Sequence, residues 1–237
     1  MNFVFDLYGT LIDIHTDESN VKFRAAVQKY FKRLNPRLGD FWAEYAGLCA
    51  LAETGEEFCE IDLFAVFKKL MGGADDKTVL KAATYFRKKS RLKLKVYGGV
   101  KGLLKELRSR GAGVYLVSNA QTCFTVEELK KLKLTRYFNG VVISSDFGKK
   151  KPSVEIFQYA LQKFKLDPRE TVYIGNEIAA DVCGAKAAGM RTAYIKSNLS
   201  PADDSLAAAE KQADFATDNF YKLSRFLLTE CGEWKKD

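Results

Sequence analysis

The chain begins with a short apolar run that ends in a carboxylate and a turn. Phe3, Val4 and Phe5 form a β-prone run that is too short for a helix and too apolar for an exposed edge strand. A carboxylate at the end of a buried strand, such as Asp6, costs free energy unless the protein uses it. In open α/β sheets, ligands bind at that end of the strands. Asp6 is therefore the first candidate for a functional group.

From Val96 onward, helical and strand-like segments alternate along the chain. Helices are expected at 100–110, 124–134, 154–165, 179–188 and 220–228, and strands at 113–117, 141–144, 171–174 and 191–195. This alternation predicts an α/β fold with a doubly wound parallel sheet and right-handed crossovers. We assign residues 1–13 and 96–237 to this Rossmann-like core domain.

The segment between these two parts of the core has a helical pattern throughout. Apolar residues recur at helical spacing, and the pattern is interrupted at Asn35-Pro36, Glu53-Thr54-Gly55 and Gly72-Gly73. The pattern predicts an inserted domain of four or five helices over residues 14–95, directly after the first strand.

Composition narrows the function classes. The 237 residues are 47% hydrophobic and 29% charged, and no apolar run approaches the roughly 18 residues of a membrane span. We expect a cytoplasmic protein without a secretory signal, with five reduced cysteines that lack metal-type spacing. The single histidine, His15, disfavours Ser-His and Cys-His mechanisms and His-rich zinc sites.

The formal net charge of +8 suits a small anionic substrate. The lysines are spread along helices opposite acids, with no basic tail and no basic strip interleaved with aromatic residues. This distribution argues against nucleic acid as a partner. It leaves the oligomeric state open.

Polar residues follow four of the expected strands or open the loops after them. Each cluster alone has an ordinary explanation, such as a helix cap, a charge at a helix start or a solvated loop. Their shared position at the carboxyl ends of successive strands is what favours a site. The clusters are Asp6, Tyr8 and Thr10; Ser118 and Asn119; Lys151 in Gly148–Pro152; and Asn176, Glu177 and Asp181.

Over essentially its whole length, this pattern resembles the haloacid dehalogenase (HAD) superfamily, in which the helical insertion is a mobile cap. The resemblance implies that Asp6 is a nucleophile that forms an aspartyl intermediate, later hydrolysed by water. It implies that Thr10 and Ser118 hydrogen-bond the transferring group and that Lys151 steadies Asp6. By the same resemblance, Asn119 helps to orient the substrate.

Tyr8 favours one branch of that superfamily. Phosphatase members usually carry a second aspartate two residues after the nucleophile, whereas haloacid dehalogenase members carry a tyrosine. A phenol, with an ordinary pKa near 10, donates a hydrogen bond at neutral pH but is a poor base. Halide leaves without a proton, so Tyr8 suits the dehalogenase reaction.

Other positions favour a phosphatase. Such dehalogenases carry an arginine after a tryptophan in an early cap helix, where this chain has Ala43, and a tyrosine after the lysine motif, where this chain has Phe157. Their last motif is poor in acids because they use no metal. This chain offers Glu177 and Asp181 there.

The resemblance also implies a cofactor, Mg²⁺. Asp6, the backbone carbonyl of Tyr8, Glu177 and Asp181 supply the hard oxygen ligands that Mg²⁺ prefers. Asn176 stands where phosphatases commonly have the directly ligating aspartate, and a neutral amide holds the ion less well.

The sequence therefore predicts a HAD-like hydrolase, best read as a Mg²⁺-dependent phosphatase. Its substrate would be a small phosphorylated metabolite with a good leaving group, such as an acyl phosphate, a phosphoanhydride or an aryl phosphate. Two alternatives stay open: a metal-independent 2-haloacid dehalogenase-type hydrolase, and a catalytically decayed HAD-like protein that binds a ligand or partner.

Overall fold

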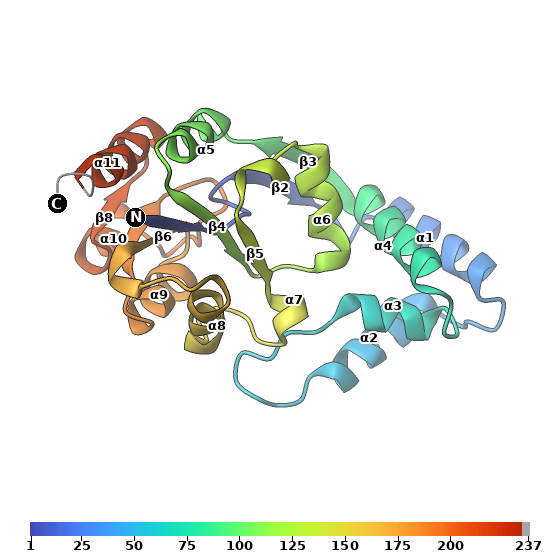
Figure 1. Cartoon of the computed structure of the whole chain (residues 1–237). Helices are drawn as coiled ribbons and strands as arrows, with labels where there is room; N and C mark the ends of the chain where they lie inside the picture. The colour runs from blue at the N-terminus through green and yellow to red at the C-terminus, as the bar shows by residue number, and fades with distance from the viewer. Residues whose placement is uncertain (234–237) are drawn as a thin grey trace.

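The computed structural model describes residues 1–233 and contains a six-stranded sheet in which all pairings are parallel (Figure 1). Its spatial order is β5-β4-β1-β6-β7-β8. The strands are β1 (Asn2–Phe5), β4 (Gly113–Ser118), β5 (Gly140–Ile143), β6 (Thr171–Gly175), β7 (Arg191–Ile195) and β8 (Phe215–Thr217). The predicted doubly wound parallel sheet is confirmed.

The strand order reverses beside β1, which has β4 on one side and β6 on the other. Phe5, the last residue of β1, is in register with Leu116 of β4 and Ile174 of β6. The loops that leave β1 and β6 therefore turn to opposite sides of the sheet and open a crevice between them. Asp6 begins the loop at this crevice.

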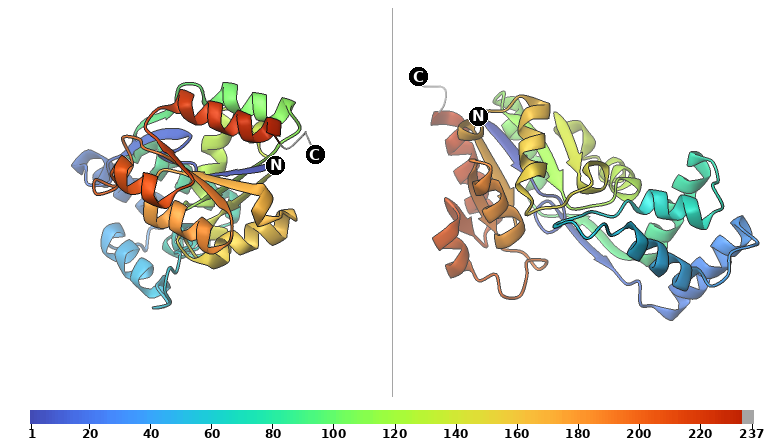
Figure 2. Two further views of the ribbon diagram at one scale, coloured as in Figure 1. Left: turned by 90° about the vertical axis from the view of Figure 1, so that its left-hand side faces the viewer. Right: turned by 90° about the horizontal axis from the view of Figure 1, so that it is seen from below.

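Helices cover both faces of the sheet (Figure 2, left). On one face lie α5 (Val100–Ser109) and α11 (Phe220–Glu233), whose leucines share a core with β1 and β4. On the other face lie α8 (Val154–Phe164) and α9 (Gly184–Ala187). The remaining helices of the core are α6 (Thr122–Lys131), α7 (Ser144–Phe147) and α10 (Leu206–Gln212). Burial on both faces explains why the strands are continuously apolar.

The insertion packs around an aromatic centre of its own and extends to one side of the sheet (Figure 1). Its helices are α1 (Val21–Leu34), α2 (Phe41–Ala52), α3 (Leu63–Leu70) and α4 (Asp76–Ser90). Asn20, Asp40, Asp62 and Asp75 cap their first turns by accepting backbone N–H bonds. Phe124 of α6 joins the aromatic centre, so the insertion and the core share buried surface.

Both ends of the insertion are strands, and the prediction of helix throughout 14–95 is wrong there. β2 (Ile12–Thr16) and β3 (Arg91–Val96) pair antiparallel and connect the helices to the core. Both segments alternate apolar and polar residues, which is the period of a strand with one buried face. The long helical patterns between these two short segments obscured their alternation.

The chain after Ile143 also differs from the expected elements. The helix expected over 179–188 is a π-helical turn, Ile178–Cys183, followed by α9. Ser144, expected to end a strand, begins α7 instead. Strand β8 and helix α10 were not expected at all, because each is short and its pattern is weak. No helix in the described part of the chain is long and apolar enough to cross a membrane.

The packing of the aromatic centre leads to a prediction about the stability of the protein. The fully buried ring of Phe86 contacts the rings of Phe23, Phe67 and Phe124. We expect Phe86→Ala to lower the free energy of unfolding by about 3–5 kcal/mol, because it leaves a cavity that the neighbours fill only in part. The control Leu51→Ala, at a side chain that is 82% exposed, should change it by less than about 0.5 kcal/mol in the same urea titration. Equal effects of the two substitutions would contradict this packing.

Candidate active site

A buried lysine joins two carboxylates at the crevice beside β1. The ammonium of Lys151 lies 2.8 Å from Oδ1 of Asp6 and 2.6 Å from Oδ1 of Asp181. It also donates to the hydroxyl of Tyr173, at 2.9 Å. All four side chains are almost fully buried. The loop after β1, the lysine loop and the segment after β6 therefore meet at one ion-paired centre.

At this centre, burial and the attraction between opposite charges shift the pKa values of the side chains in opposite directions. Burial alone would lower the pKa of Lys151, but the charges of Asp181 and Asp6 outweigh it and hold the pKa well above its usual value. For Asp6, burial raises the pKa, and the repulsion from Asp181 adds to it, while Lys151 opposes the rise. Without the lysine, the repulsion between the two carboxylates would be unopposed in so dry a site.

Asp181 is held from two directions. Its Oδ2 accepts the backbone N–H groups of Asn176 (2.9 Å) and Glu177 (3.0 Å), while its Oδ1 accepts from Lys151 and from the Tyr173 hydroxyl (3.2 Å). A Cβ atom at Gly175 would lie 2.2 Å from this carboxylate, so only glycine allows the close approach. With its oxygens engaged in this way, Asp181 can orient Lys151 toward Asp6.

Ser118 and Thr10 bring hydroxyl groups to the same centre. Ser118, at the end of β4, is fully buried and donates to Oδ1 of Asp6 at 3.3 Å. Thr10 donates to Oδ1 of Asn176 at 3.1 Å. Of the two predicted donors, Ser118 of β4 contacts Asp6 directly, whereas Thr10, in the turn after β1, contacts Asn176.

Asn176 carries a buried amide group without a partner. Its Nδ2 is the one buried side-chain nitrogen or oxygen in the described chain that has no hydrogen bond. The turn at Gly9, where φ is +90°, packs directly against the Asn176 carboxamide. A Cβ atom at Gly9 would lie 2.4 Å from this nitrogen. A carboxamide turned by 180° would keep its bond to Thr10 and present its oxygen in place of this nitrogen. This atom therefore marks a place where a ligand would relieve an unsatisfied polar group.

Asn119 is engaged with the lysine loop. Its Nδ2 donates to the carbonyl of Lys151 at 3.0 Å, and its Oδ1 accepts the N–H of the same residue at 2.7 Å. This pair of bonds fixes the backbone that carries the central ammonium, beside the cis peptide between Lys151 and Pro152. The predicted role of Asn119 in orienting substrate stays a prediction.

Tyr8 points into a polar network that no sequence pattern predicted. Its hydroxyl donates to Oε2 of Glu128 at 2.6 Å and lies 3.1 Å from Oγ1 of Thr125. Burial raises the pKa of Tyr8, and the charge of Glu128 raises it further. At neutral pH this phenol is therefore a bound hydrogen-bond donor and not a base.

Glu128 connects this network to the insertion. Its Oε1 lies 2.9 Å from Nε of Arg87 and 2.9 Å from Nη1 of Arg91, and the carboxylate is only 2% exposed. Arg87 belongs to α4 and Arg91 begins β3. Glu128 itself has the spacing of an ordinary residue of an amphipathic helix, so only the fold reveals its partners.

The insertion also contacts the core on the opposite side of the site. Glu60 donates its N–H to the carbonyl of Gly148 at 2.9 Å, and Lys150 donates its N–H to the carbonyl of Phe58 at 2.8 Å. The Glu60 carboxylate accepts from Ser144 at 2.6 Å. These bonds attach the 58–60 segment directly to the loop that precedes Lys151.

The predicted Mg²⁺ ligands form a small oxygen-rich set. Within residues 1–233, no three His, Cys, Asp or Glu side chains converge as a group that could hold a metal ion. Asp181 is already bonded to Lys151 and to two amides, whereas Asp6 and Tyr8 directly precede the turn at Gly9, which the Asn176 carboxamide approaches closely. With the carboxamide turned by 180°, its Oδ1 would take the place of the unpartnered Nδ2, and that oxygen suits an ion that keeps several waters and few protein ligands.

Comparison with known proteins identifies the relatives of this chain. A family model described as Haloacid dehalogenase-like hydrolase matches residues 3–195. A phosphoserine phosphatase from Thermus thermophilus is 33% identical over 68% of this chain and 65% of its own length. A glyceraldehyde 3-phosphate phosphatase from Pyrococcus abyssi is 28% identical over 81% of this chain and 79% of its own.

The alignments with the first of these curated relatives span about half to two thirds of the relatives' length. Among solved structures, a 2-haloacid dehalogenase from Pseudomonas syringae is similar with a TM-score of 0.64 and 22% identity, over 97% of this chain and 99% of that one. A HAD phosphatase from Thermococcus onnurineus has a TM-score of 0.61 and 22% identity, over 95% and 97%. Both reactions therefore occur on this fold.

The central ion pair predicts a pH dependence of stability. The pKa of Lys151 is raised by folding, so its stabilising contribution is complete below pH 10 and is lost as the pH rises through the native value. We expect the wild-type protein to lose more free energy of unfolding than Lys151→Met between pH 9 and pH 11. The control Lys101→Met, at an exposed lysine of α5, should follow the wild type. Parallel pH profiles for the wild type and Lys151→Met would contradict the ion-paired centre.

Proposed function

The chain belongs to the haloacid dehalogenase-like hydrolase family, and on this premise we propose that it is a phosphatase that uses Asp6 as a covalent nucleophile. The observation that carries the proposal is the buried Asp6 carboxylate at the switch point of the sheet, 2.8 Å from the Lys151 ammonium. The curated relatives named as phosphatases of small phosphorylated metabolites support this substrate class.

In the proposed reaction, a carboxylate oxygen of Asp6 attacks the phosphorus of the substrate. A bond forms between Asp6 and phosphorus, the bond to the leaving oxygen breaks, and that oxygen departs with the electron pair. Water then attacks the aspartyl phosphate, which releases inorganic phosphate and regenerates the carboxylate. Lys151, Ser118 and Thr10 would offset and hydrogen-bond the phosphoryl oxygens, where negative charge concentrates.

Tyr8 bears on the leaving group. No carboxyl group stands at this position to protonate a departing alkoxide, and the Tyr8 hydroxyl is bonded to Glu128. Because nothing here supplies a proton easily, we propose that the preferred substrates are acyl phosphates, phosphoanhydrides or aryl phosphates, whose leaving groups are stable as anions.

Mg²⁺ is the proposed cofactor, held by Asp6, the backbone carbonyl of Tyr8 and the Asn176 carboxamide, with Glu177 at the rim. When bound, the ion supplies positive charge that offsets the phosphoryl group. Asp181 contributes from behind by holding Lys151 and the N–H groups of Asn176 and Glu177. The neutral amide at Asn176 implies weak binding, since a carboxylate would attract the ion more strongly.

A dehalogenase remains the second candidate, because Tyr8 and the neutral Asn176 both suit a reaction that needs neither a proton for the leaving group nor a metal. In that reaction Asp6 would displace halide from the carbon of a 2-haloacid. The third candidate, a decayed HAD-like binding protein, would keep the fold without turnover.

The test compares substrates and conditions. We expect the protein to release phosphate from acetyl phosphate and p-nitrophenyl phosphate with Mg²⁺, and alkyl phosphates to be hydrolysed more slowly. Asp6→Asn should lower kcat by about three orders of magnitude or more, because an amide is a very poor nucleophile. Lys101→Ala, at an exposed position, is the control and should keep the wild-type rate.

Two outcomes would replace the phosphatase proposal with one of the other two candidates. Release of halide from 2-chloropropionate in excess EDTA, without phosphate release, would establish the dehalogenase. A folded protein that is inactive in both assays would favour the binding protein.

Asn176 gives a separate prediction about the metal. We expect Asn176→Asp to tighten Mg²⁺ binding by about tenfold or more in a calorimetric titration, because a carboxylate replaces a neutral ligand. The control Asn198→Asp, which places the same change outside the proposed ligand set, should leave the affinity within about twofold. Unchanged Mg²⁺ binding in Asn176→Asp would show that this position does not ligate the ion.

A further inference from the structure

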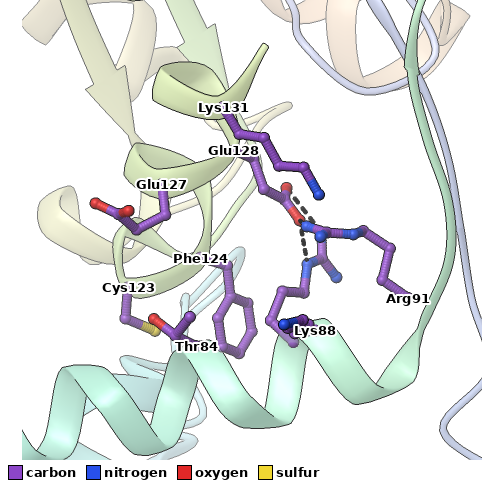
Figure 3. A pocket seen from close by; sticks show the side chains of 9 residues that line it. Thr84, Lys88, Arg91, Cys123, Phe124, Glu127, Glu128 and Lys131 are labelled. Carbon is purple, nitrogen blue, oxygen red and sulfur yellow. Dashed lines mark hydrogen bonds and ion pairs between the residues drawn. The ribbon is translucent and has the colours of Figure 1, made fainter.

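A second hollow lies where the insertion meets the core, between α4 and α6 (Figure 3). Its volume is about 250 Å³, and its lining includes Arg87, Lys88 and Arg91 from the insertion and Lys131, Glu127 and Glu128 from α6. Asp6 and Lys151 are not part of this lining. The hollow is therefore distinct from the candidate active site.

The hollow carries excess positive charge. Its four cationic side chains face two carboxylates. Both arginines are bonded to Glu128, while Glu127 is bonded to Lys130, at 2.8 Å, outside the lining. The ammonium groups of Lys88 and Lys131 form no ion pair or hydrogen bond within the described residues. Two cations are thus left without a counter-charge in one concave space.

The lining residues come from three elements, α4, β3 and α6. In Figure 3, Lys131 extends from α6 toward the guanidinium group of Arg91 beside Glu128, while Lys88 lies on α4 on the other side of the opening. The Arg91 side chain is mostly buried and fixed by its bond to Glu128, so its position is set before any ligand arrives. A fixed guanidinium and two free ammonium groups are the groups that proteins use to bind phosphate.

We propose that this hollow is a binding site for a phosphate group, either inorganic phosphate or the phosphate of a compact metabolite. The Lys88 and Lys131 ammonium groups supply the charge, and Arg91 supplies a directed donor. The site binds and does not react, because no nucleophile that faces it is activated. This inference stands whether or not the protein proves to be a phosphatase.

Occupancy of this hollow would also strengthen the contact between the insertion and the core. A bound anion would bridge Lys88 of α4 and Lys131 of α6, in parallel with the bonds from Arg87 and Arg91 to Glu128. Glu128 in turn holds the Tyr8 hydroxyl, two residues from Asp6. The anion would therefore favour the arrangement in which α4 rests on α6 and Tyr8 is held.

The test uses two charge-matched double variants of the full chain. Lys88→Ala with Lys131→Ala removes both unpaired cations, and Lys101→Ala with Lys105→Ala removes two exposed lysines of α5 as the control. Orthophosphate and glycerol 3-phosphate are titrated separately by calorimetry in 0.15 M KCl, the latter in an Asp6→Asn background to prevent turnover. Circular dichroism checks that each variant is folded.

We expect the wild type and the control to bind orthophosphate at a site whose affinity falls at least tenfold in Lys88→Ala/Lys131→Ala, with or without a second class of site at Asp6. The kcat of this double variant should stay within about threefold of the wild-type value, and phosphate should raise its Tm less than that of the control. Whichever ligand binds this site more tightly identifies the source of the phosphate. Identical titrations of the two double variants, or no orthophosphate binding by the wild type in 0.15 M KCl, would overturn the proposal.

Discussion

The burial of one ammonium group between two carboxylates governs the architecture of this protein. Lys151 comes from a loop, Asp6 from the end of β1 and Asp181 from the π-helical turn after β6. Removal of Lys151 would leave two uncompensated carboxylates in a dry interior. Neighbouring groups hold these side chains in place. Asn119 hydrogen-bonds the backbone of the lysine, two backbone amides hydrogen-bond Asp181, and Gly175 leaves room for the Asp181 carboxylate.

The insertion contacts the core on two sides of that centre by different means. Near Lys151 the contacts are main-chain hydrogen bonds between the 58–60 and 148–150 segments, which depend little on side-chain identity. Near Tyr8 they are charged bonds from Arg87 and Arg91 to Glu128, which is almost fully buried. Since the second contact ends at the Tyr8 hydroxyl, the position of the insertion is physically linked to the turn that carries Asp6.

Some residues of the site could be predicted from their local position in the sequence, and others are recognised only by partners that are distant in the chain. Asp6, Ser118, Lys151 and Asp181 were predicted because each follows a strand or opens the next loop, and parallel strands bring such positions to one edge. Glu128, Arg87 and Tyr173 were missed because nothing local distinguishes them from ordinary helix or strand residues. The strands β2 and β3 were missed for a different reason: each is a short alternating segment, and each borders a long helical pattern of the insertion.

The sequence by itself determined the doubly wound parallel sheet, the helical insertion and the set of polar residues at the strand ends, because these follow from local periodicity and chain order. Only the tertiary structure decided what each polar group faces. In the folded protein, Tyr8 is hydrogen-bonded to Glu128, Asp181 faces Lys151, and the side-chain nitrogen of Asn176 has no partner. Those outcomes depend on residues far apart in the chain, whose distances are set by packing and not by any local preference.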